Sequence, residues 1–142
     1  MRLSILLLHS LDYKRAPTSF PPHLFLEMLD GLQSAGFQTL DLERAVAGLR
    51  TGSLEPRSLC VTFDDGCSSV YEAGFEPMLE RGFTATLYVI ARHADWSVLR
   101  QMHKQGFQIG SHTLTHADLR GLDYDRLKDE IVGSQREIED RL

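Results

Sequence analysis

Short apolar runs alternate along this chain with longer segments in which apolar residues recur at helical spacing. Because each run is continuous rather than alternating, the runs are typical of strands in a parallel sheet that is buried on both faces. They predict five strands, at Ser4–Leu8, Phe37–Leu40, Leu59–Phe63, Thr84–Ile90 and Phe107–Gly110. The longer segments predict five helices, at Pro22–Ala35, Leu42–Arg50, Ser68–Arg81, Ser97–Gln105 and Asp123–Leu142. Strands that alternate with helices indicate an α/β fold.

A repeated dipeptide supports these boundaries. Glycine followed by phenylalanine joins a predicted helix to a predicted strand at Gly36-Phe37, Gly82-Phe83 and Gly106-Phe107. Glycine can end a helix in the left-handed conformation, and the phenylalanine then begins a buried strand. Residues 12–22 and 51–57 are predicted surface loops, but no segment has the composition of an interdomain linker. We therefore expect residues 1–142 to belong to one domain.

Composition and charge argue against several classes of function. Of the 142 residues, 42% are hydrophobic and 25% are charged, as in an ordinary globular domain with a hydrophobic core. The net charge of −5 and the lack of a basic run argue against nucleic acid and anionic membranes as partners. The two cysteines, Cys60 and Cys67, do not suggest a disulfide framework. We expect Cys60 to lie in the core and Cys67 not to be a metal ligand.

The N-terminal segment could be mistaken for a targeting sequence. Its apolar stretch, within Met1–Leu8, is shorter than the apolar region of a secretory signal and far too short to span a bilayer. We interpret it as a buried first strand. This interpretation predicts a cytoplasmic protein without a membrane span.

Two short motifs carry the candidate chemistry. Asp64 and Asp65 precede Gly66 directly after one predicted strand, and His112 and His116 follow another. Histidines four residues apart lie on one face of a helical turn, and with one carboxylate they form a three-ligand set for a divalent metal. The adjacent carboxylate is then placed to accept the proton of a water molecule. Together the motifs predict a metal-dependent hydrolase.

Each motif alone has a simpler explanation. Asp-Asp-Gly is common in turns, and two histidines on an exposed helix need no ligand. Both motifs follow predicted buried strands, however, and active sites of parallel α/β proteins gather at the carboxyl ends of strands. His9 ends the first strand at the same edge. The sequence is equally compatible with a role for His9 in substrate binding and with a simple backbone hydrogen bond.

These residues resemble the polysaccharide deacetylase family, also called the NodB-homology or carbohydrate esterase family four enzymes. The family's Thr-Phe-Asp-Asp-Gly string is present at Thr62–Gly66, and its two-histidine motif appears at Ser111–His116. The segments Leu8-His9, Phe83–Val89 and Leu119–Leu142 are also similar, so the resemblance covers nearly the whole chain.

The resemblance implies a distorted (β/α) barrel and hydrolysis of an N-acetyl group on an amino sugar. Carried over by position, Asp65, His112 and His116 would bind a divalent metal, with Zn²⁺ preferred and Co²⁺, Ni²⁺ or Fe²⁺ as alternatives. Asp64 would be the general base, and the substrate would be an N-acetylated saccharide. The alternative is a metal-binding but catalytically incomplete module that binds a saccharide or a partner chain.

The family pattern continues with further motifs, and Leu142 lies about where they would begin. No residue of this chain matches the family's general acid or the arginine that orients its base. We therefore expect the N-terminal part of a deacetylase domain, folded as an incomplete (β/α) barrel of about five parallel strands. Its inward apolar face would be exposed, with five candidate residues: Ile5, Leu7, Val61, Leu87 and Ile109. Such a face predicts a homo-oligomer or a complementing chain, and weak or absent activity.

Overall fold

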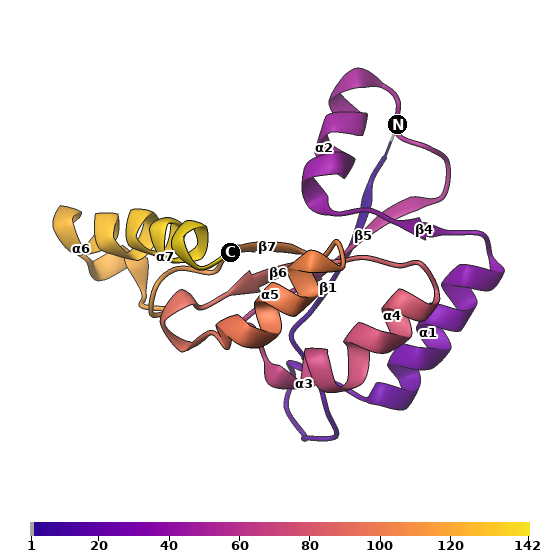
Figure 1. Cartoon of the computed structure of the whole chain (residues 1–142), viewed down its shortest axis with the longest axis horizontal. Helices are drawn as coiled ribbons and strands as arrows, with labels where there is room; N and C mark the ends of the chain where they lie inside the picture. The colour runs from indigo at the N-terminus through magenta and orange to yellow at the C-terminus, as the bar shows by residue number, and fades with distance from the viewer. Residues whose placement is uncertain (1) are drawn as a thin grey trace.

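The computed structural model describes residues 2–142 and contains an open parallel sheet (Figure 1). Its strands are β1 (Ser4–Leu8), β4 (Gln38–Thr39), β5 (Ser58–Phe63), β6 (Thr86–Val89) and β7 (Gln108–Ser111). The strand order is β1-β5-β6-β7, and β4 pairs with the first two residues of β5. Every pair is parallel. The predicted α/β class and the five predicted parallel strands are confirmed.

Helices connect the strands. They are α1 (Pro22–Ser34), α2 (Leu42–Thr51), α3 (Ser68–Val70), α4 (Glu76–Glu80), α5 (Trp96–Lys104), α6 (Tyr124–Lys128) and α7 (Ser134–Arg141). Two π turns, Tyr71–Phe75 and Asp129–Gly133, join α3 to α4 and α6 to α7. Each of the corresponding predicted helices is therefore one continuous rod with a wider turn inside it. Figure 1 shows the α6–α7 rod extending to one side of the sheet, with α2 standing apart from it near the N-terminus.

The hydrophobic core lies between the sheet and helices α1, α3–α4 and α5. Alternate residues of β5, namely Leu59, Val61 and Phe63, pack with the helices in one buried cluster. The helices contribute seven buried side chains: Phe25, Leu29, Val70, Phe75, Met78, Leu99 and Met102. Phe25 meets Phe63 edge-on, with ring centroids 6.0 Å apart, a favourable arrangement for two aromatic rings. The core therefore covers one face of the sheet.

The opposite face of the sheet is partly open. The β1–β5 register pairs Ile5 with Cys60 and Leu7 with Thr62, so these four side chains share this face. Ile5 is 50% exposed and Leu7 is 57% exposed. The prediction of exposed apolar residues on an open face is confirmed for these two.

The same prediction is wrong for Val61 and Leu87, which are 0% and 2% exposed. Successive side chains of a strand point to opposite faces, and these two residues have the parity that faces the helices. Ile109 pairs with Leu87 and packs partly against the same core, so it also lies on the covered face. A continuous apolar run shows that a strand is buried but not which of its residues face inward.

The turns follow the predicted pattern, with one addition. Gly36, Gly82 and Gly106 have φ of 73°, 68° and 91°, which confirms the left-handed helix ends. A small parallel sheet of two strands follows β1: β2 (Ser10–Leu11) directly precedes the predicted loop, and β3 (Ser19–Phe20) lies within it. Two residues per strand are too few to give a periodic signal, so this sheet was not predicted.

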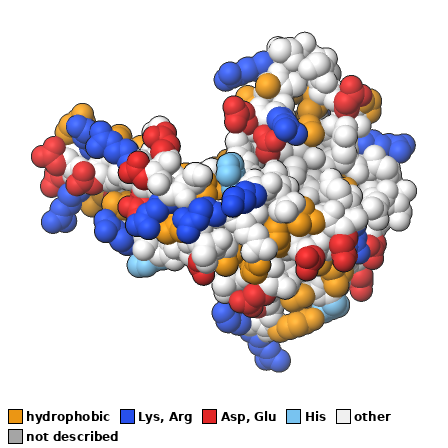
Figure 2. Space-filling model, in the orientation of Figure 1, with side chains coloured by type: hydrophobic (Ala, Val, Ile, Leu, Met, Phe, Trp, Pro, Cys, Tyr) orange, Lys and Arg blue, Asp and Glu red, His pale blue; other side chains and the backbone are white. Residues whose placement is uncertain are grey.

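The side of the sheet at β7 is hollowed. One pocket lies between β7 and α7, and another lies between α2 and strands β6 and β7. Figure 2 shows an indentation of the surface between the α6–α7 rod and α2. The sheet is therefore not closed into a barrel. Among residues 2–142, every helix is too short or too polar to cross a membrane.

Candidate metal and catalytic site

The turn after β5 presents both carboxylates of the first motif. The N–H of Asp64 donates to the carbonyl of Leu8 at 3.0 Å and extends the β1–β5 ladder by one residue. Asp65 and Gly66 then have φ of 70° and 72°, which reverses the chain before α3. A positive φ is uncommon for aspartate and persists where the surroundings hold the backbone in place. The turn leaves both carboxylates half-buried at the carboxyl edge of the sheet.

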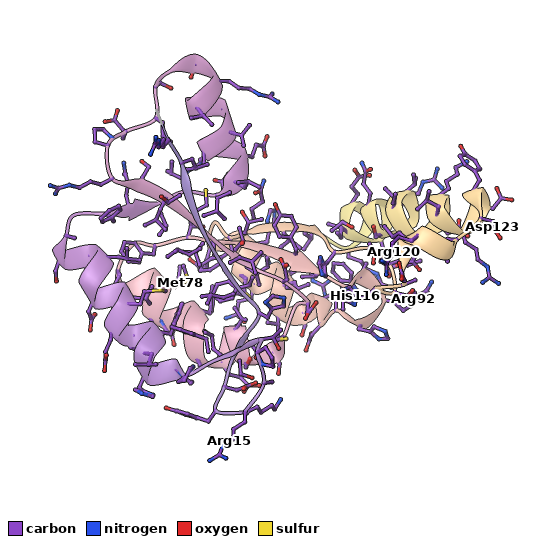
Figure 3. All side chains as sticks on the ribbon, turned by 180° about the vertical axis from the view of Figure 1, so that it is seen from behind. Arg15, Met78, Arg92, His116, Arg120 and Asp123 are labelled. Carbon is purple, nitrogen blue, oxygen red and sulfur yellow. The ribbon has the colours of Figure 1, made fainter. Side chains whose placement is uncertain are left out.

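The two histidines lie on the loop after β7, and not on the helical turn that their spacing suggested. Figure 3 labels His116 on this loop. Thr113 and His116 have φ of 68° and 63°, which excludes a right-handed helix here. The Oγ1 atom of Thr113 accepts from the N–H of His116 at 2.9 Å and closes the loop. The imidazole rings of His112 and His116 therefore stack, with centroids 4.8 Å apart. The spacing predicted proximity correctly, although the backbone that creates it is a loop.

The structure brings the three predicted ligands together. One Asp65 oxygen lies 3.4 Å from Nε2 of His112 and 3.9 Å from Nε2 of His116. One ligand atom from each residue lies within 4.8 Å of the others. In a tetrahedral site with bonds of about 2.0–2.1 Å, donor atoms are separated by about 3.3 Å, so small side-chain rotations would bring these atoms into range. Two imidazoles and one carboxylate form a donor set that fits a divalent transition metal.

Asp64 lies beside this group and is not part of it. The register of β1, β5 and β6 makes His9 and Tyr88 the neighbours of Asp64 on the two adjacent strands. Burial raises the pKa of the Tyr88 phenol, and the negative charge of Asp64 raises it further. The side chains of both neighbouring residues are of types that can exchange hydrogen bonds with a carboxylate or a ligand.

Two further residues at this site belong to no motif in the sequence. Tyr88 gives no signal because the side-by-side position of β5 and β6 cannot be read from periodicity. Glu130 lies on the π turn of the α6–α7 rod and contacts the histidine loop. In the sequence its segment is recognised only by the helical spacing of its apolar residues, which says nothing about a polar contact. Cys67 lies outside the three-residue group, and burial, followed by the charge of Asp65, raises the pKa of its thiol.

Comparisons with known proteins identify similar sequences. The sequence model of the family described as Polysaccharide deacetylase matches residues 51–142. The chain is 29% identical to YxkH of Bacillus subtilis (strain 168) over 143 residues, which cover 95% of this chain and 50% of YxkH. It is 32% identical to a chitin deacetylase of Pestalotiopsis sp over 108 residues, 70% of this chain and 36% of that protein. The chain thus spans half the length, or less, of these curated relatives.

A solved structure shows the same fold. The Streptococcus pyogenes deacetylase PplD, determined in complex with acetate, superimposes with a TM-score of 0.89 at 22% sequence identity. The superposition covers 100% of this chain and 70% of PplD. The open sheet described above therefore has the strand and helix arrangement of NodB-type deacetylases over its whole length.

Proposed function

The chain belongs to the polysaccharide deacetylase family, and we propose that it acts with a divalent metal to remove N-acetyl groups from amino-sugar polymers. One observation carries this proposal. Asp65, His112 and His116 converge beside Asp64 at the carboxyl edge of a parallel sheet. Ligands and a base gathered at this edge are typical of hydrolytic active sites in parallel α/β proteins.

The proposed metal ligands are Asp65, His112 and His116. When bound, a divalent metal polarises an amide carbonyl and lowers the pKa of water from about 16 toward 7. A set of two histidines and one carboxylate favours Zn²⁺ but also suits Co²⁺, Ni²⁺ or Fe²⁺. The three ligand side chains are 33%, 29% and 57% exposed, which leaves one side of the group open to water and substrate.

We assign Asp64 as the general base. It directly precedes a ligand in a tight turn, and as a carboxylate it can accept the proton of the water that attacks the N-acetyl carbon. The neighbouring Tyr88 phenol is protonated at neutral pH, as tyrosines ordinarily are, and burial together with the charge of Asp64 raises its pKa further. It is therefore available as a hydrogen-bond donor beside the base.

The proposed substrate is an N-acetylated saccharide. The support is the family itself, together with a relative that is named a chitin deacetylase. A second candidate function is a module that binds metal and a saccharide or partner chain without turnover. These two functions differ in one observable product, which is acetate.

The experiment combines metal analysis with acetate release from N-acetylglucosamine oligomers. Asp64→Asn is expected to keep the metal and to lose activity by about 10²–10⁴-fold, because the amide cannot accept the proton. His116→Ala is expected to lose both metal and activity. Loss of metal from Asp64→Asn would instead make Asp64 a ligand. Bound metal and saccharide without acetate release would establish the second function, and wild-type protein that binds no divalent metal would refute the first.

We also propose that the open face of the sheet is covered by a second copy or by a complementing chain. Ile5 and Leu7 are each at least half exposed on this face. Exposed apolar residues on a sheet with an unpaired edge favour association. In the described part of the chain, β1 and β7 are the two edges of the main sheet.

A further inference from the structure

The histidine loop holds a backbone conformation that it would not adopt alone. Thr113 and His116 both have positive φ, although neither is glycine and threonine is β-branched. A non-glycine residue in this region is strained and persists only where neighbouring structure holds it. Other contacts must therefore stabilise the conformation that brings His116 to His112.

Glu130 supplies these contacts from the α6–α7 rod. Its Oε2 atom accepts from the N–H of Leu114 at 3.1 Å and from the N–H of Thr115 at 2.9 Å. Its Oε1 atom accepts from the hydroxyl of Thr115. All three donors lie between the two histidines, so one carboxylate holds the middle of the loop.

The environment of Glu130 makes these hydrogen bonds strong. The residue is only 8% exposed, and a buried carboxylate is stable only when it is hydrogen-bonded. Burial would raise the pKa of Glu130, but the hydrogen bonds from Thr115 and Leu114 outweigh burial and hold the pKa below its usual range. Glu130 is therefore an anion at neutral pH, and its bonds to the loop are charge-assisted.

The π turn places Glu130 against the loop. The N–H of Leu114 also reaches the backbone carbonyl of Glu130, at 3.0 Å, so the rod offers both a side chain and a main-chain acceptor at this point. Gly133, the last residue of the turn, lies against Leu114, since a Cβ there would be 3.5 Å from Cδ2 of Leu114. Ser134 follows Gly133 directly, and its hydroxyl lies 2.6 Å from the hydroxyl of Ser111, which joins the rod to the end of β7.

We propose that Glu130 is a positioning residue that fixes the His112–His116 loop in its ligating conformation before any metal binds. This inference rests on the proposed metal-binding function. It goes further by assigning preorganisation of the site to a carboxylate that touches neither histidine and comes from the helix that follows. The shape of the site then depends on the docking of the α6–α7 rod.

The test uses the metal-free and the Co²⁺-loaded protein. In Glu130→Ala without metal, amide exchange at Leu114 and Thr115 should accelerate at least about tenfold, while the core of β5 and β6 stays protected. Co²⁺ should bind about 10–100-fold more weakly, the usual effect of losing a group that orients a ligand, and its visible absorption spectrum should change. Asp129→Ala removes an exposed carboxylate from the same π turn and should leave both measurements unchanged.

Two further variants separate positioning from general stability. Glu130→Gln keeps an oxygen for the two N–H groups, and its amide can donate to the Thr115 hydroxyl, so Co²⁺ affinity should stay within about threefold of wild type. Thr115→Val removes one donor at an exposed position and should weaken Co²⁺ binding without loss of folding, even if Glu130→Ala does not fold.

Three results would overturn the proposal. The first is an unchanged Co²⁺ affinity and spectrum in Thr115→Val and in folded Glu130→Ala. The second is a loss of amide protection in Glu130→Ala that spreads over the whole sheet. The third is a Glu130→Gln variant that binds Co²⁺ as weakly as Glu130→Ala. A wild-type protein that binds no metal would instead refute the proposed function. The amide exchange of the metal-free variants would still decide whether Glu130 holds the loop.

Discussion

Replacing Gly66 with alanine tests how the turn after β5 sets the position of Asp65. Gly66 has φ of 72°, and a Cβ on it would lie 3.2 Å from both Cβ and Cγ1 of Val89, a fully buried residue of β6. The left-handed conformation costs an L-residue about 1–2 kcal/mol. The contact adds overpacking, for which about 1 kcal/mol is the lower end of the usual range. Gly66→Ala should therefore reduce the free energy of unfolding by about 2–3 kcal/mol.

Gly82→Ala is the matched control for this variant. Gly82 has φ of 68°, but a Cβ on it would meet no atom within 4 Å. It carries the same conformational cost and the same change in the unfolded chain, so only the contact with Val89 differs. Urea unfolding should show Gly66→Ala to be less stable than Gly82→Ala by about 1 kcal/mol. Metal affinity should fall only in Gly66→Ala, because Asp65 moves with the turn. Equal unfolding free energies, within about 0.5 kcal/mol, would refute the role of Val89.

Two further measurements follow from the structure. Because the pKa of Glu130 is lowered in the folded protein, the unfolded chain takes up a proton first as the pH falls. The stability that this carboxylate contributes is therefore complete above its unfolded pKa of about 4.3. That contribution is lost as the pH falls through the lower pKa of the folded state. Acid unfolding should therefore destabilise the wild type more steeply than Glu130→Gln, and parallel pH profiles would contradict this. In sedimentation at micromolar concentration the wild type should self-associate, and Leu7→Ser, which makes an exposed side chain polar, should weaken the association; a stable wild-type monomer would rule this out.

The sequence predicted the elements of this fold better than it predicted their contacts. The strand at Ser58–Phe63 differs from its predicted bounds by one residue at its start, and the helix at Trp96–Lys104 differs by one residue at each end, because apolar runs and glycine stops are local signals. Which face of a strand points inward is not local, and this is why Val61 and Leu87 were placed on the wrong side.

The candidate site shows the same division. The prediction that Asp65, His112 and His116 lie together depended only on motifs that follow parallel strands, and the structure does bring them together. The loop conformation of the histidines depends on Glu130, which is fourteen positions beyond His116 and has no signature of its own. A hydrogen bond from a helix to a distant loop leaves no periodic pattern in the sequence, so this contact cannot be predicted from the sequence and is seen only in the structure.

The pairing of β1 also bears on how the chain folds as it is synthesised. Ser4 pairs with Leu59, and β5 is the only described strand that pairs with β1. During synthesis β1 must therefore wait, with its aliphatic residues uncovered, until α1, α2 and β5 have followed. Pairings between segments so distant in sequence form slowly and leave apolar segments open to aggregation meanwhile. Docking of β1 onto β5 then completes the edge at which Asp64 sits.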